Sequence, residues 1–584
     1  MEPESPTLPA NSLRSHLNYE PEILRFGTSG RRGLVVHLTQ LEIYINAFAE
    51  LQYLQSLAPS EGGIVCGDDL YFAYDLRPSS TEYVPEECGR GELAQAVTRA
   101  IHDAGMKPVN LGAVPTPALA YLAFSRGKGS IMVTGSHIPF DRNGYKTNTS
   151  CGELLKEQEE PIGRAVERVR QALYNQPFAS SAFDADGRFK SGHAELPAPV
   201  DDARAAYAQR YSGFFAGQSL NGMRLLFYQH SAVGRDLVPD ILRQLGAEVI
   251  LTGRSDSFVP IDTENIDAAQ LGVIQSLVDE AAAKHGHIDA VVSTDGDSDR
   301  PLLLGVDRST NKVRFFGGDL LGMVVAEYLN ADAVVVPISC NDAIDQSNLG
   351  PVLEPKTRIG SPYVIAGMER ARSKGRRAIC GWEANGGFLT GSSIERNGKV
   401  LDALPTRDAV LPLLAVLFSA HEQSLSLADL FNRLPPRFSR AALLKRFPRR
   451  TGLAIVERFS PADPAVHDVH FKSDRITLLD AYGRELPGRS GLANQADGIR
   501  RQLSHFFKAA AGFGAITQLN YTDGVRVTFE NGDVAHLRPS GNADELRIYA
   551  VSDSQSRAEE ITILATAEPD GILRSMESFV LQTP

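Results

Sequence analysis

The sequence predicts an α/β protein of several domains that ends in an antiparallel α+β module. Its 584 residues exceed what one hydrophobic core supports, and at ~150 residues per domain the length suggests about four domains. Over most of the chain, short apolar strands alternate with helices whose apolar residues recur every three or four positions. Such alternation is typical of strand layers joined by crossover helices.

In the N-terminal third, leucine, isoleucine and phenylalanine at helical spacing predict a helix over 41–57. Further helices are expected over 92–104 and 116–124, and strands over 107–111 and 130–133. The strand over 130–133 leads directly into a polar loop with the sequence TGSHIPFDRNGYK.

The central part repeats this alternation. The expected strands are 224–228, 248–252, 288–293, 333–338 and 377–380, and the expected helices are 237–245, 267–284, 319–329 and 363–373. Three times an apolar strand enters a Gly-rich polar loop and returns to apolar sequence: IMVTGSHIP, VVSTDGDSDRPLLLG and AICGWEANGGFLTG. Polar loops at strand ends are where α/β sheets bind ligands, so these loops are candidate site segments.

The C-terminal module differs from the rest. Strands over 525–529 and 534–537 flank Asn531-Gly532, the dipeptide that most strongly indicates a hairpin. A strand over 546–551 and a helix over 556–567 follow, which predicts antiparallel α+β structure. The segment 438–518 is rich in arginine and mixes helical and strand periodicities, so it predicts no definite elements.

The composition excludes several classes of protein. A net charge of −12 disfavours nucleic-acid binding, and five scattered cysteines without a CxxC pair predict neither a zinc site nor a disulfide framework. The N-terminal residues lack the basic and apolar regions of a signal peptide, and no apolar run is long enough to span a bilayer. We expect a cytoplasmic protein with a disordered lead-in over 1–20 and no membrane partner.

The loop DGDSDR follows an apolar strand and alternates its carboxylates. Asp295, Asp297 and Asp299 could converge on one hard cation such as Mg²⁺, which prefers oxygen ligands. An EF-hand is excluded, because that motif requires glycine where Arg300 stands. The alternative is a solvated acidic turn.

The loop TGSHIPFDRNGYK contains Ser136, His137 and Lys146. It is not a nucleophile elbow, and adjacent serine and histidine rarely align as nucleophile and base. By itself the serine is best interpreted as a turn residue. Near a divalent ion and cations, however, its hydroxyl could carry a phosphoryl group, because that transfer depends on positioning and charge neutralisation.

Three further loops have residues suited to anions or sugars. FGTSGRRG combines flexible glycines with Arg32, GWEANGG offers Glu383 and Asn385 to sugar hydroxyls, and RPSGNADELR places Arg538 and Arg547 around a possible anion cradle. Asp544 and Glu545 would have to point away from that cradle. The alternatives are a surface turn, a β-turn with Trp382 in the core, and a solvated corner between strands, respectively.

In this order the five loops resemble those of the α-D-phosphohexomutase superfamily, the phosphoglucomutases and phosphomannomutases, over nearly the whole chain. The family patterns are FGTSG-x-RG, T-x-SHNP-x-x-x-NG-x-K, an identical DGDSDR, GE-x-SGH and RPSGTEP-x-x-R. AYDLRPSS over 73–80 and VPTPAL over 114–119 also resemble first-domain segments. The sequence departs from these patterns at Ile138 for Asn, at Asn385 for Ser, at Gly387 for His, and over 542–544.

The resemblance implies an α/β architecture of three similar mixed α/β sandwich domains followed by a smaller α+β C-terminal domain around a central cleft. The expected domains are 21–200 with the phosphoserine loop, 201–317 with the metal-binding loop, 318–436 with the sugar-binding loop and 437–584 with the phosphate-binding loop.

The resemblance also implies residue roles. The expected catalytic residues are Ser136, Lys146, Arg32 and His137. The expected metal ligands are Ser136, Asp295, Asp297 and Asp299. The expected substrate-binding residues are Arg300, Glu383, Asn385, Arg538, Ser540, Gly541, Asn542 and Arg547.

The implied activity is interconversion of hexose 6-phosphate and hexose 1-phosphate through a phosphoserine enzyme and a hexose 1,6-bisphosphate, with Mg²⁺. Phosphomannomutase is the expected activity and phosphoglucomutase the alternative. A metal-dependent sugar-phosphate phosphatase and a non-catalytic sugar-phosphate-binding protein stay open. The expected partners are small hexose phosphates, with no nucleic acid and no membrane, and the expected assembly is a monomer or homodimer.

Overall fold

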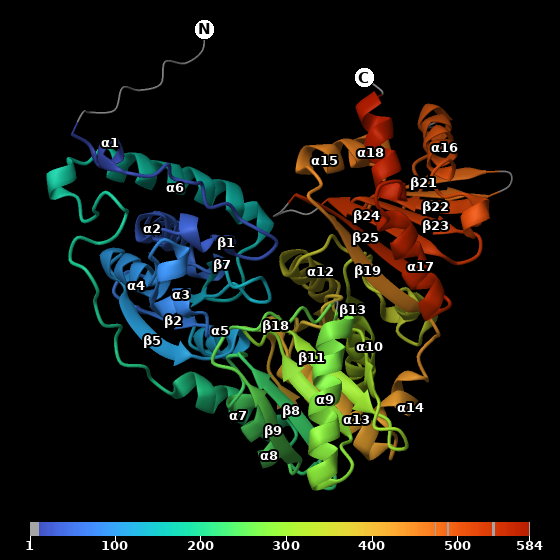
Figure 1. Cartoon of the computed structure of the whole chain (residues 1–584), viewed down its shortest axis with the longest axis horizontal. Coiled ribbons are helices and arrows are strands. Elements are labelled where there is room, and N and C mark those ends of the chain that lie inside the picture. The colour runs from blue at the N-terminus through green and yellow to red at the C-terminus, as the bar shows by residue number, and fades with distance from the viewer. Residues whose placement is uncertain (1–10, 265, 473–474, 488–489, 540–543, 583–584) are drawn as a thin grey trace. The chain divides into compact units, whose positions relative to one another are not determined.

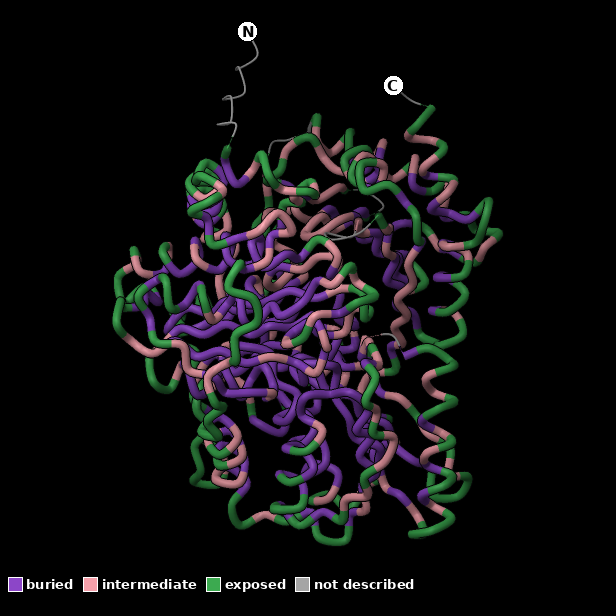
Figure 2. Tube along the Cα trace, turned by 60° about the vertical axis from the view of Figure 1, so that its left-hand side comes forward, coloured by how far each residue is buried: buried purple, intermediate pink, exposed green. Residues whose placement is uncertain are grey.

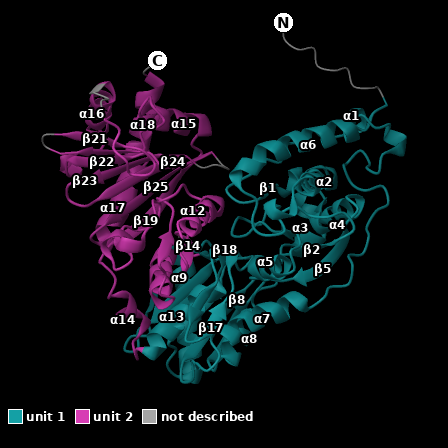
Figure 3. Ribbon diagram, turned by 180° about the vertical axis from the view of Figure 1, so that it is seen from behind, with its two compact units in different colours: residues 1–315, 387–422 teal, residues 316–386, 423–584 magenta. Residues whose placement is uncertain are grey.

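The computed structural model describes residues 11–264, 266–472, 475–487, 490–539 and 544–582, and Figure 1 labels their elements. The chain divides into two compact units, which Figure 3 shows in different colours. Unit 1 comprises residues 1–315 and 387–422, and unit 2 comprises residues 316–386 and 423–584. The segment expected to form the third domain, 318–436, is thus shared between the two units.

The first sheet of unit 1 has five strands. In spatial order they are β1 (Arg31–Leu34), β7 (Arg142–Asn148), β6 (Ser130–Val133), β2 (Asp69–Tyr74) and β5 (Lys107–Ala113). β2 is parallel to β5 and β6, whereas β7 is antiparallel to β6 and β1. The sequence did not predict β1 or β7, because their polar residues read as loop.

Helices pack against this sheet around an apolar core. They include α2 (Gln40–Ser56), α4 (Leu93–Asp103), α5 (Thr116–Ser125) and α6 (Glu159–Tyr174). The first three confirm the helices predicted over 41–57, 92–104 and 116–124. The Thr39 hydroxyl accepts a hydrogen bond from the Glu42 amide and caps the start of α2, as N-cap threonines commonly do.

The disorder expected over 1–20 does not extend over its second half. Residues 1–10 lie outside the described part of the chain, but Leu13–His16 forms the short helix α1. Leu13 is fully buried in the core of the first sheet, and the Ser12 hydroxyl caps α1. A single buried leucine in a Pro-rich, acidic stretch gives no periodicity, so the sequence does not reveal this docking.

The second sheet of unit 1 also has five strands. Their order is β12 (Val313–Phe315), β11 (Pro301–Val306), β10 (Ala290–Thr294), β8 (Arg224–His230) and β9 (Glu248–Arg254). β10 and β11 are buried along their whole length, and such buried stretches appear purple in Figure 2. The helices α8 (Leu237–Gln244) and α9 (Ala268–His285) confirm the predicted alternation.

The remaining elements of unit 1 include one helix between its two sheets in the sequence and several elements from 387–422. They are α7 (Asp202–Phe214), β15 (Phe388–Thr390), β16 (Ile394–Arg396), β17 (Lys399–Leu401), β18 (Leu404–Asp408) and α13 (Val410–Glu422). β15 and β18 pair antiparallel. Tyr207 and Tyr211 of α7 both donate hydrogen bonds to the carboxylate of Asp408, which fixes the end of β18.

Unit 2 begins with an α/β segment and continues into the antiparallel module. The α/β segment contains α10 (Gly318–Tyr328), β13 (Ala333–Val335), α12 (Ser361–Ser373) and β14 (Ile379–Trp382), and β13 is parallel to β14. The module has a seven-stranded sheet in the order β19-β25-β24-β23-β22-β20-β21. The predicted hairpin is confirmed by β23 (Val525–Phe529) and β24 (Val534–Pro539), followed by β25 (Glu545–Ser552) and α17 (Gln555–Thr566).

The segment without definite predictions, 438–518, supplies the rest of this module. Its elements are β19 (Phe438–Lys445), α15 (Arg449–Arg458), β20 (Asp468–Phe471), β21 (Ile476–Leu479), α16 (Ser490–Ser504) and β22 (Ile516–Asn520). β19 pairs along its whole length with β25, although most of its residues are only half-buried. Half-burial removes the alternation of apolar and polar residues that would have marked this strand.

A buried histidine predicts that unit 2 loses stability in mild acid. The His536 ring is buried, its Nε2 donates to the Asp523 carbonyl, and burial lowers the pKa of His536 to about 4. The unfolded chain binds a proton near pH 6.5, so stability present above that pH is lost as the pH falls toward 4, by about 2 kcal/mol between pH 7 and pH 5. Trp382, the only tryptophan, is buried in unit 2 and reports its unfolding by urea. His536→Asn should show a smaller loss between pH 7 and pH 5; an equal loss would contradict this account.

Candidate active site

Ser136 and Lys146 lie on either side of the turn that joins β6 to β7. Ser136 lies three residues beyond the end of the buried strand β6, is itself fully buried, and has a left-handed backbone with φ of 56°. Lys146 lies within β7, where it pairs with Met132 of β6. The antiparallel return of the chain therefore places the predicted nucleophile and the predicted proton carrier at the same end of the sheet.

Strand register explains why Arg32 and Lys146 share a face of this sheet. Arg32 of β1 pairs with Gly144 of β7, and residues paired across an antiparallel ladder point to the same side. Lys146 lies two residues from Gly144 and points to that side too. Arg31 points to the opposite side, where its Nε donates to Glu50 at 2.6 Å within the core. Burial and the nearby Arg300 guanidinium lower the pKa of Arg32 to about 10.

The predicted metal-binding loop connects β10 to β11 and is completely buried. The Ser136 hydroxyl donates to Asp295 Oδ2 at 2.8 Å. Lys146 Nζ donates to Asp297 Oδ2 and to Asp299 Oδ2, both at 2.7 Å. Residues separated by about 150 positions in the sequence thus converge in unit 1.

The aspartate cluster can hold a metal ion. One carboxylate oxygen from each of Asp295, Asp297 and Asp299 lies within 4.8 Å of the others. Asp297 Oδ1 and Asp299 Oδ1 are buried, and neither has a hydrogen-bond partner among the residues that the structure describes. Burying a carboxylate oxygen without a hydrogen bond is costly unless a cation binds it. These two oxygens are therefore suited to bind a divalent ion.

The three aspartates differ in how their charge is stabilised. Burial, with Asp297 and Asp299 beside it, raises the pKa of Asp295. Burial would also raise the pKa of Asp297, but the Lys146 ammonium outweighs it and lowers that pKa below its ordinary value. For Asp299 the Arg407 guanidinium has the same effect against burial, and its pKa is lowered. Cations supplied by other segments therefore keep two of the carboxylates ionised.

His137 and Arg300 lie beside the cluster with weaker contacts. His137 Nδ1 is 3.4 Å from the Ser136 hydroxyl, at the limit of a hydrogen bond. Arg300 Nε lies 3.6 Å from Asp299 Oδ1 and 3.9 Å from Asp295 Oδ2. The side chain of Arg300 thus lies against the carboxylates of its own loop.

Two residues that the sequence analysis did not assign to the site contact these aspartates. The Thr116 hydroxyl, at the start of α5, donates to Asp297 Oδ2 at 2.7 Å. Arg407 of β18 donates to Asp299 Oδ2 through Nε at 3.0 Å and Nη2 at 2.9 Å. The VPTPAL segment contains Thr116 and could have suggested it, whereas LPTRD carries no signal for a role of Arg407.

Arg407 also explains one departure from the family pattern. Gly387 stands where the family usually has histidine, and a Cβ atom at this position would lie 2.5 Å from Arg407 Cδ. A larger residue at 387 would collide with the Arg407 side chain as it is placed here. In this chain the Arg407 guanidinium, which binds Asp299, therefore lies beside position 387, where the family usually has histidine.

We expect Arg407→Met to raise the metal concentration needed for half-maximal activity about 10–100-fold, because groups that orient metal ligands have effects of this size. Asp299 would keep Lys146 but lose two hydrogen bonds. Activity measured against Mg²⁺ concentration tests this, with Arg396→Met of β16 as the control. An unchanged metal requirement in Arg407→Met would exclude this role.

The predicted sugar-binding loop lies in unit 2, directly after β14. Glu383 and Asn385 are buried, and the Gly386 amide donates to the Glu383 carbonyl in a tight turn. Trp382 packs against Gly322 of α10, where a Cβ atom would lie 2.4 Å from the indole ring. The tryptophan is thus a core residue, while the polar residues after it form the turn.

The predicted phosphate-binding loop is described in part. Ser540, Gly541 and Asn542 lie outside the described residues, whereas Arg538 and Arg547 face each other across β24 and β25. Asp523 holds Arg538 Nε at 3.1 Å. Two paired arginines suit an anion.

The neighbouring acidic residues of this loop behave differently from each other. Asp544 turns away, since its carboxylate accepts from the Arg449 amide at the start of α15. The expectation that Glu545 points away is wrong: its Oε2 lies 3.7 Å from Arg547 Nη2. At this distance the ion pair is loose, and the Arg547 side chain is 36% exposed.

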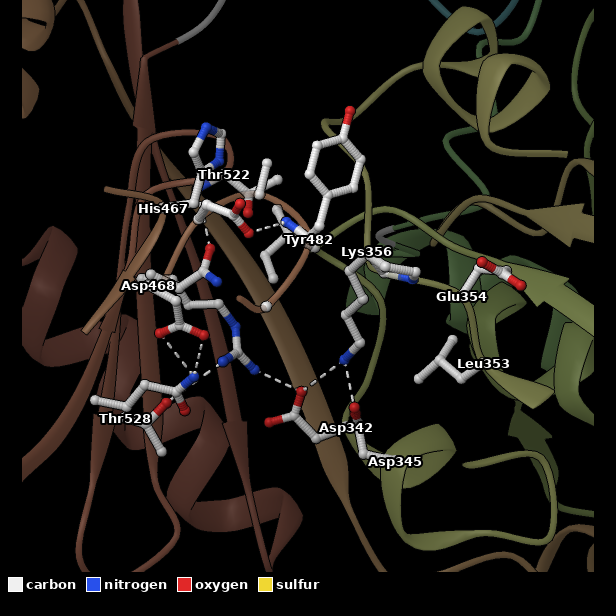
Figure 4. A pocket seen from close by; sticks show the side chains of 18 of the residues that line it. Asp342, Asp345, Leu353, Glu354, Lys356, His467, Asp468, Tyr482, Thr522 and Thr528 are labelled. Carbon is white, nitrogen blue, oxygen red and sulfur yellow. Dashed lines mark hydrogen bonds and ion pairs between the residues drawn. The ribbon is translucent and has the colours of Figure 1, made fainter. Parts of the chain in front are cut away.

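A separate cavity of about 610 Å³ lies in unit 2 (Figure 4). Lys356 bridges Asp342 and Asp345 in its wall, and Arg526 also binds Asp342. Among the described residues, none of the predicted site residues lines this cavity. Its carboxylates in Figure 4 already have protein cations or amides as partners, so we assign no ligand to it.

In the part of the chain that the structure describes, no helix combines the length and the apolar character needed to cross a bilayer.

Comparison with known proteins places these features in one family. Residues 24–173 match the family "Phosphoglucomutase/phosphomannomutase, alpha/beta/alpha domain I", and residues 317–438 match its domain III. A phosphomannomutase of Salmonella muenchen is 35% identical, with 92% of this chain and 93% of the relative covered. A phosphoglucosamine mutase of Actinobacillus pleuropneumoniae is 30% identical, with 59% and 70% covered.

A solved structure confirms the architecture. The phosphoglucomutase/phosphomannomutase family protein of Burkholderia thailandensis superposes with a TM-score of 0.61 at 17% identity, covering 95% of this chain and 98% of that one. The chain belongs to the α-D-phosphohexomutase superfamily.

Proposed function

We propose that this isomerase is a phosphomannomutase that interconverts mannose 6-phosphate and mannose 1-phosphate. The observation that carries the proposal is the Ser136 hydroxyl, which is buried and 2.8 Å from Asp295. Asp295 belongs to a cluster of three aspartates, and the other two bind Lys146. A hydroxyl among carboxylates that suit a hard cation, with a lysine bound to the same carboxylates, suits transfer of a phosphoryl group.

In the proposed reaction, a hexose hydroxyl attacks the phosphorus of phospho-Ser136. The new P–O bond forms as the bond to Ser136 Oγ breaks, and Lys146 transfers the proton of the attacking hydroxyl to Ser136 Oγ. The product is a hexose 1,6-bisphosphate. After this molecule has turned over, its other phosphoryl group returns to Ser136 by the reverse step, which releases the isomeric monophosphate.

Asp295, Asp297, Asp299 and the phosphoserine would hold Mg²⁺. When bound, this ion would offset negative charge on the transferring phosphoryl group. Arg407 and Thr116 orient two of the carboxylates, so that Asp297 Oδ1 and Asp299 Oδ1 stay available as ligands. Burial of the cluster keeps water from the phosphoserine, which hydrolysis would otherwise consume.

The remaining roles follow the family motifs. Glu383 and Asn385 would bind sugar hydroxyls, which offer similar partners in either orientation of the sugar. Arg538 and Arg547, with Ser540, would hold the phosphate that is not reacting. His137 and Arg300 would contact the phosphoryl group and the substrate.

We propose mannose phosphates as the substrates because the phosphomannomutase relative shares 35% identity over nearly the whole chain, whereas the phosphoglucosamine mutase relative covers 59% of it. Glucose and mannose differ only at C2, so phosphoglucomutase activity is the alternative. A bridging water can replace one hydroxyl contact, and the enzyme could then use both sugars.

The test compares mannose 1-phosphate, glucose 1-phosphate and glucosamine 1-phosphate with the wild-type enzyme, Mg²⁺ and a trace of the matching 1,6-bisphosphate. We expect each substrate that is used to give its 6-phosphate, with the highest kcat/KM for mannose 1-phosphate. A preference for glucose would make the chain a phosphoglucomutase. Inorganic phosphate without an isomer would indicate a phosphatase, and binding without any product would indicate a binding protein.

A further inference from the structure

Arg77 is a buried arginine beside the phosphoserine loop to which none of the roles above is assigned. It precedes the short helix α3 (Pro78–Thr81) and belongs to the segment AYDLRPSS. Its side chain is fully buried. Placing a guanidinium in a protein interior is costly unless its donors are satisfied, so its partners indicate what it is for.

The partners of Arg77 are backbone carbonyls of one loop. Nη2 donates to the carbonyls of Ser136 at 2.8 Å and Ile138 at 2.6 Å. Nη1 donates to those of Pro139 at 2.8 Å and Arg142 at 3.1 Å. One guanidinium thus gathers four carbonyls from the seven-residue turn 136–142. These carbonyls point inward, toward the positive charge, and the turn is held at both ends.

Asp75, two residues earlier, holds the amide side of the same loop. Its Oδ2 accepts from the Thr134 hydroxyl at 2.7 Å and from the Gly135 amide at 3.3 Å, and lies 3.3 Å from Arg77 Nε. The Thr134 hydroxyl in turn accepts from the Ser136 amide at 2.7 Å. The Asp75–Arg77 pair therefore fixes both the amide and the carbonyl of Ser136.

Two further contacts leave the guanidinium little freedom. The ring of Phe258 lies over it, with 3.8 Å from Arg77 Cζ to the ring centre. Gly135 also lies against it, since a Cβ atom at this position would be 2.6 Å from Arg77 Nε. A desolvated cation on an aromatic face is strongly held.

The conformation of Ser136 requires such support. A left-handed backbone costs a non-glycine residue ~1–2 kcal/mol, and strained backbone persists only where the surroundings over-determine it. At Ser136 this backbone accompanies a side chain directed at Asp295. Relaxation to an ordinary conformation would turn the hydroxyl away from the aspartate cluster.

We propose that Arg77, together with Asp75, is a positioning residue that holds the phosphoserine loop in its strained, reactive conformation. This inference rests on the proposed function. Arg77 contacts the loop backbone and not the reacting atoms, so it acts through Ser136. A displacement of the Ser136 hydroxyl by about 1 Å is enough to reduce the rate of transfer about 10²-fold.

The experiment compares Arg77→Lys with Arg170→Lys. A lysine at 77 keeps the charge but cannot reach four carbonyls. Arg170 is a matched control, because it is also buried in unit 1 and donates to Glu42 at 2.8 Å, away from the site. Both variants should lose thermal stability. Only Arg77→Lys should lower kcat, about 10²-fold with KM changed less than about threefold, and slow phosphorylation of Ser136 by the 1,6-bisphosphate to a similar degree.

Each other outcome has a defined meaning. If Arg77→Lys keeps kcat within about threefold of wild type, or changes KM alone, the positioning role is overturned. If Arg77→Lys does not fold, Phe258→Leu tests the proposal by removing the aromatic ring that holds the Arg77 guanidinium. This variant should lower kcat several-fold, and an unchanged kcat would overturn the proposal. Wild-type enzyme measured in parallel separates this from the proposed function, because a wild type without phosphoserine or isomer rejects that function whatever Arg77 does.

Discussion

Replacing Ser136 with alanine is expected to lower kcat by at least ~10⁴-fold, because the group that carries the phosphoryl is removed and no parallel route replaces it. The fold should be preserved. Ser136 Oγ makes one strong hydrogen bond, to Asp295, and alanine fits the space that serine leaves. The rate of isomerisation and the intact mass of the protein after exposure to the 1,6-bisphosphate are the two measurements.

Ser130→Ala is the matched control for this experiment. Ser130 is also fully buried, lies at the start of β6, and accepts a hydrogen bond from Asn148 at 3.0 Å. We expect the Ser130→Ala variant to be active and to be phosphorylated at Ser136. Undiminished turnover in Ser136→Ala would remove Ser136 from the reaction, and loss of activity in both variants would point to damage of the strand and not of the nucleophile.

The sequence predicted the elements of this chain best where one face of a helix or strand is fully buried. Helix α2 and strand β6 show strong periodicity or continuous apolar character, and both were predicted to within a residue or two. Strands β1 and β7 were missed because they are rich in polar residues, among them Arg32 and Lys146 of the candidate site. Polar residues thus hid the local structure that places the functional groups.

The candidate site shows the same division between local and distant information. The loops of Ser136 and Asp295 are recognisable as motifs, and the structure brings them together at hydrogen-bond distance. Arg77 and Arg407 carry no such mark. Their importance arises from folding, which brings a short helix and a strand from distant parts of the chain against those loops. No local sequence pattern predicts that Arg407 will bind a buried carboxylate or that Arg77 will bind several backbone carbonyls.

The sequence also did not predict how the chain divides into compact units. The resemblance predicts one domain over 318–436, and the family's domain III matches residues 317–438. Within this stretch, 387–422 packs with unit 1. The physical reason lies in side chains such as Asp408, which binds Tyr207 and Tyr211 of α7, and Phe418, which stacks on Phe215 at 4.6 Å. These contacts join segments some 200 residues apart, a separation that periodicity does not address.

The second large effect is expected from Asp297→Asn. Asparagine has almost the same shape, and its amide oxygen can still accept from Thr116, but its side chain carries no charge. Asp297 Oδ1, which is buried without a hydrogen-bond partner among the described residues, would lose the charge that attracts a cation. Lys146 would keep its bond to Asp299 but lose the charge of its other carboxylate partner, Asp297.

We therefore expect Asp297→Asn to need at least about 10²-fold more Mg²⁺ for half-maximal activity and to lower kcat about 10³-fold at saturating metal, because the ligand and the partner of Lys146 are lost together. Activity against Mg²⁺ concentration and direct metal binding measured by calorimetry give two independent readouts. Asp279→Asn, in the exposed part of α9, is the control for loss of one negative charge. If Asp297→Asn binds and uses Mg²⁺ as the wild type does, the aspartate cluster serves as an internal counter-charge for Lys146 and Arg407, and the cation must bind elsewhere.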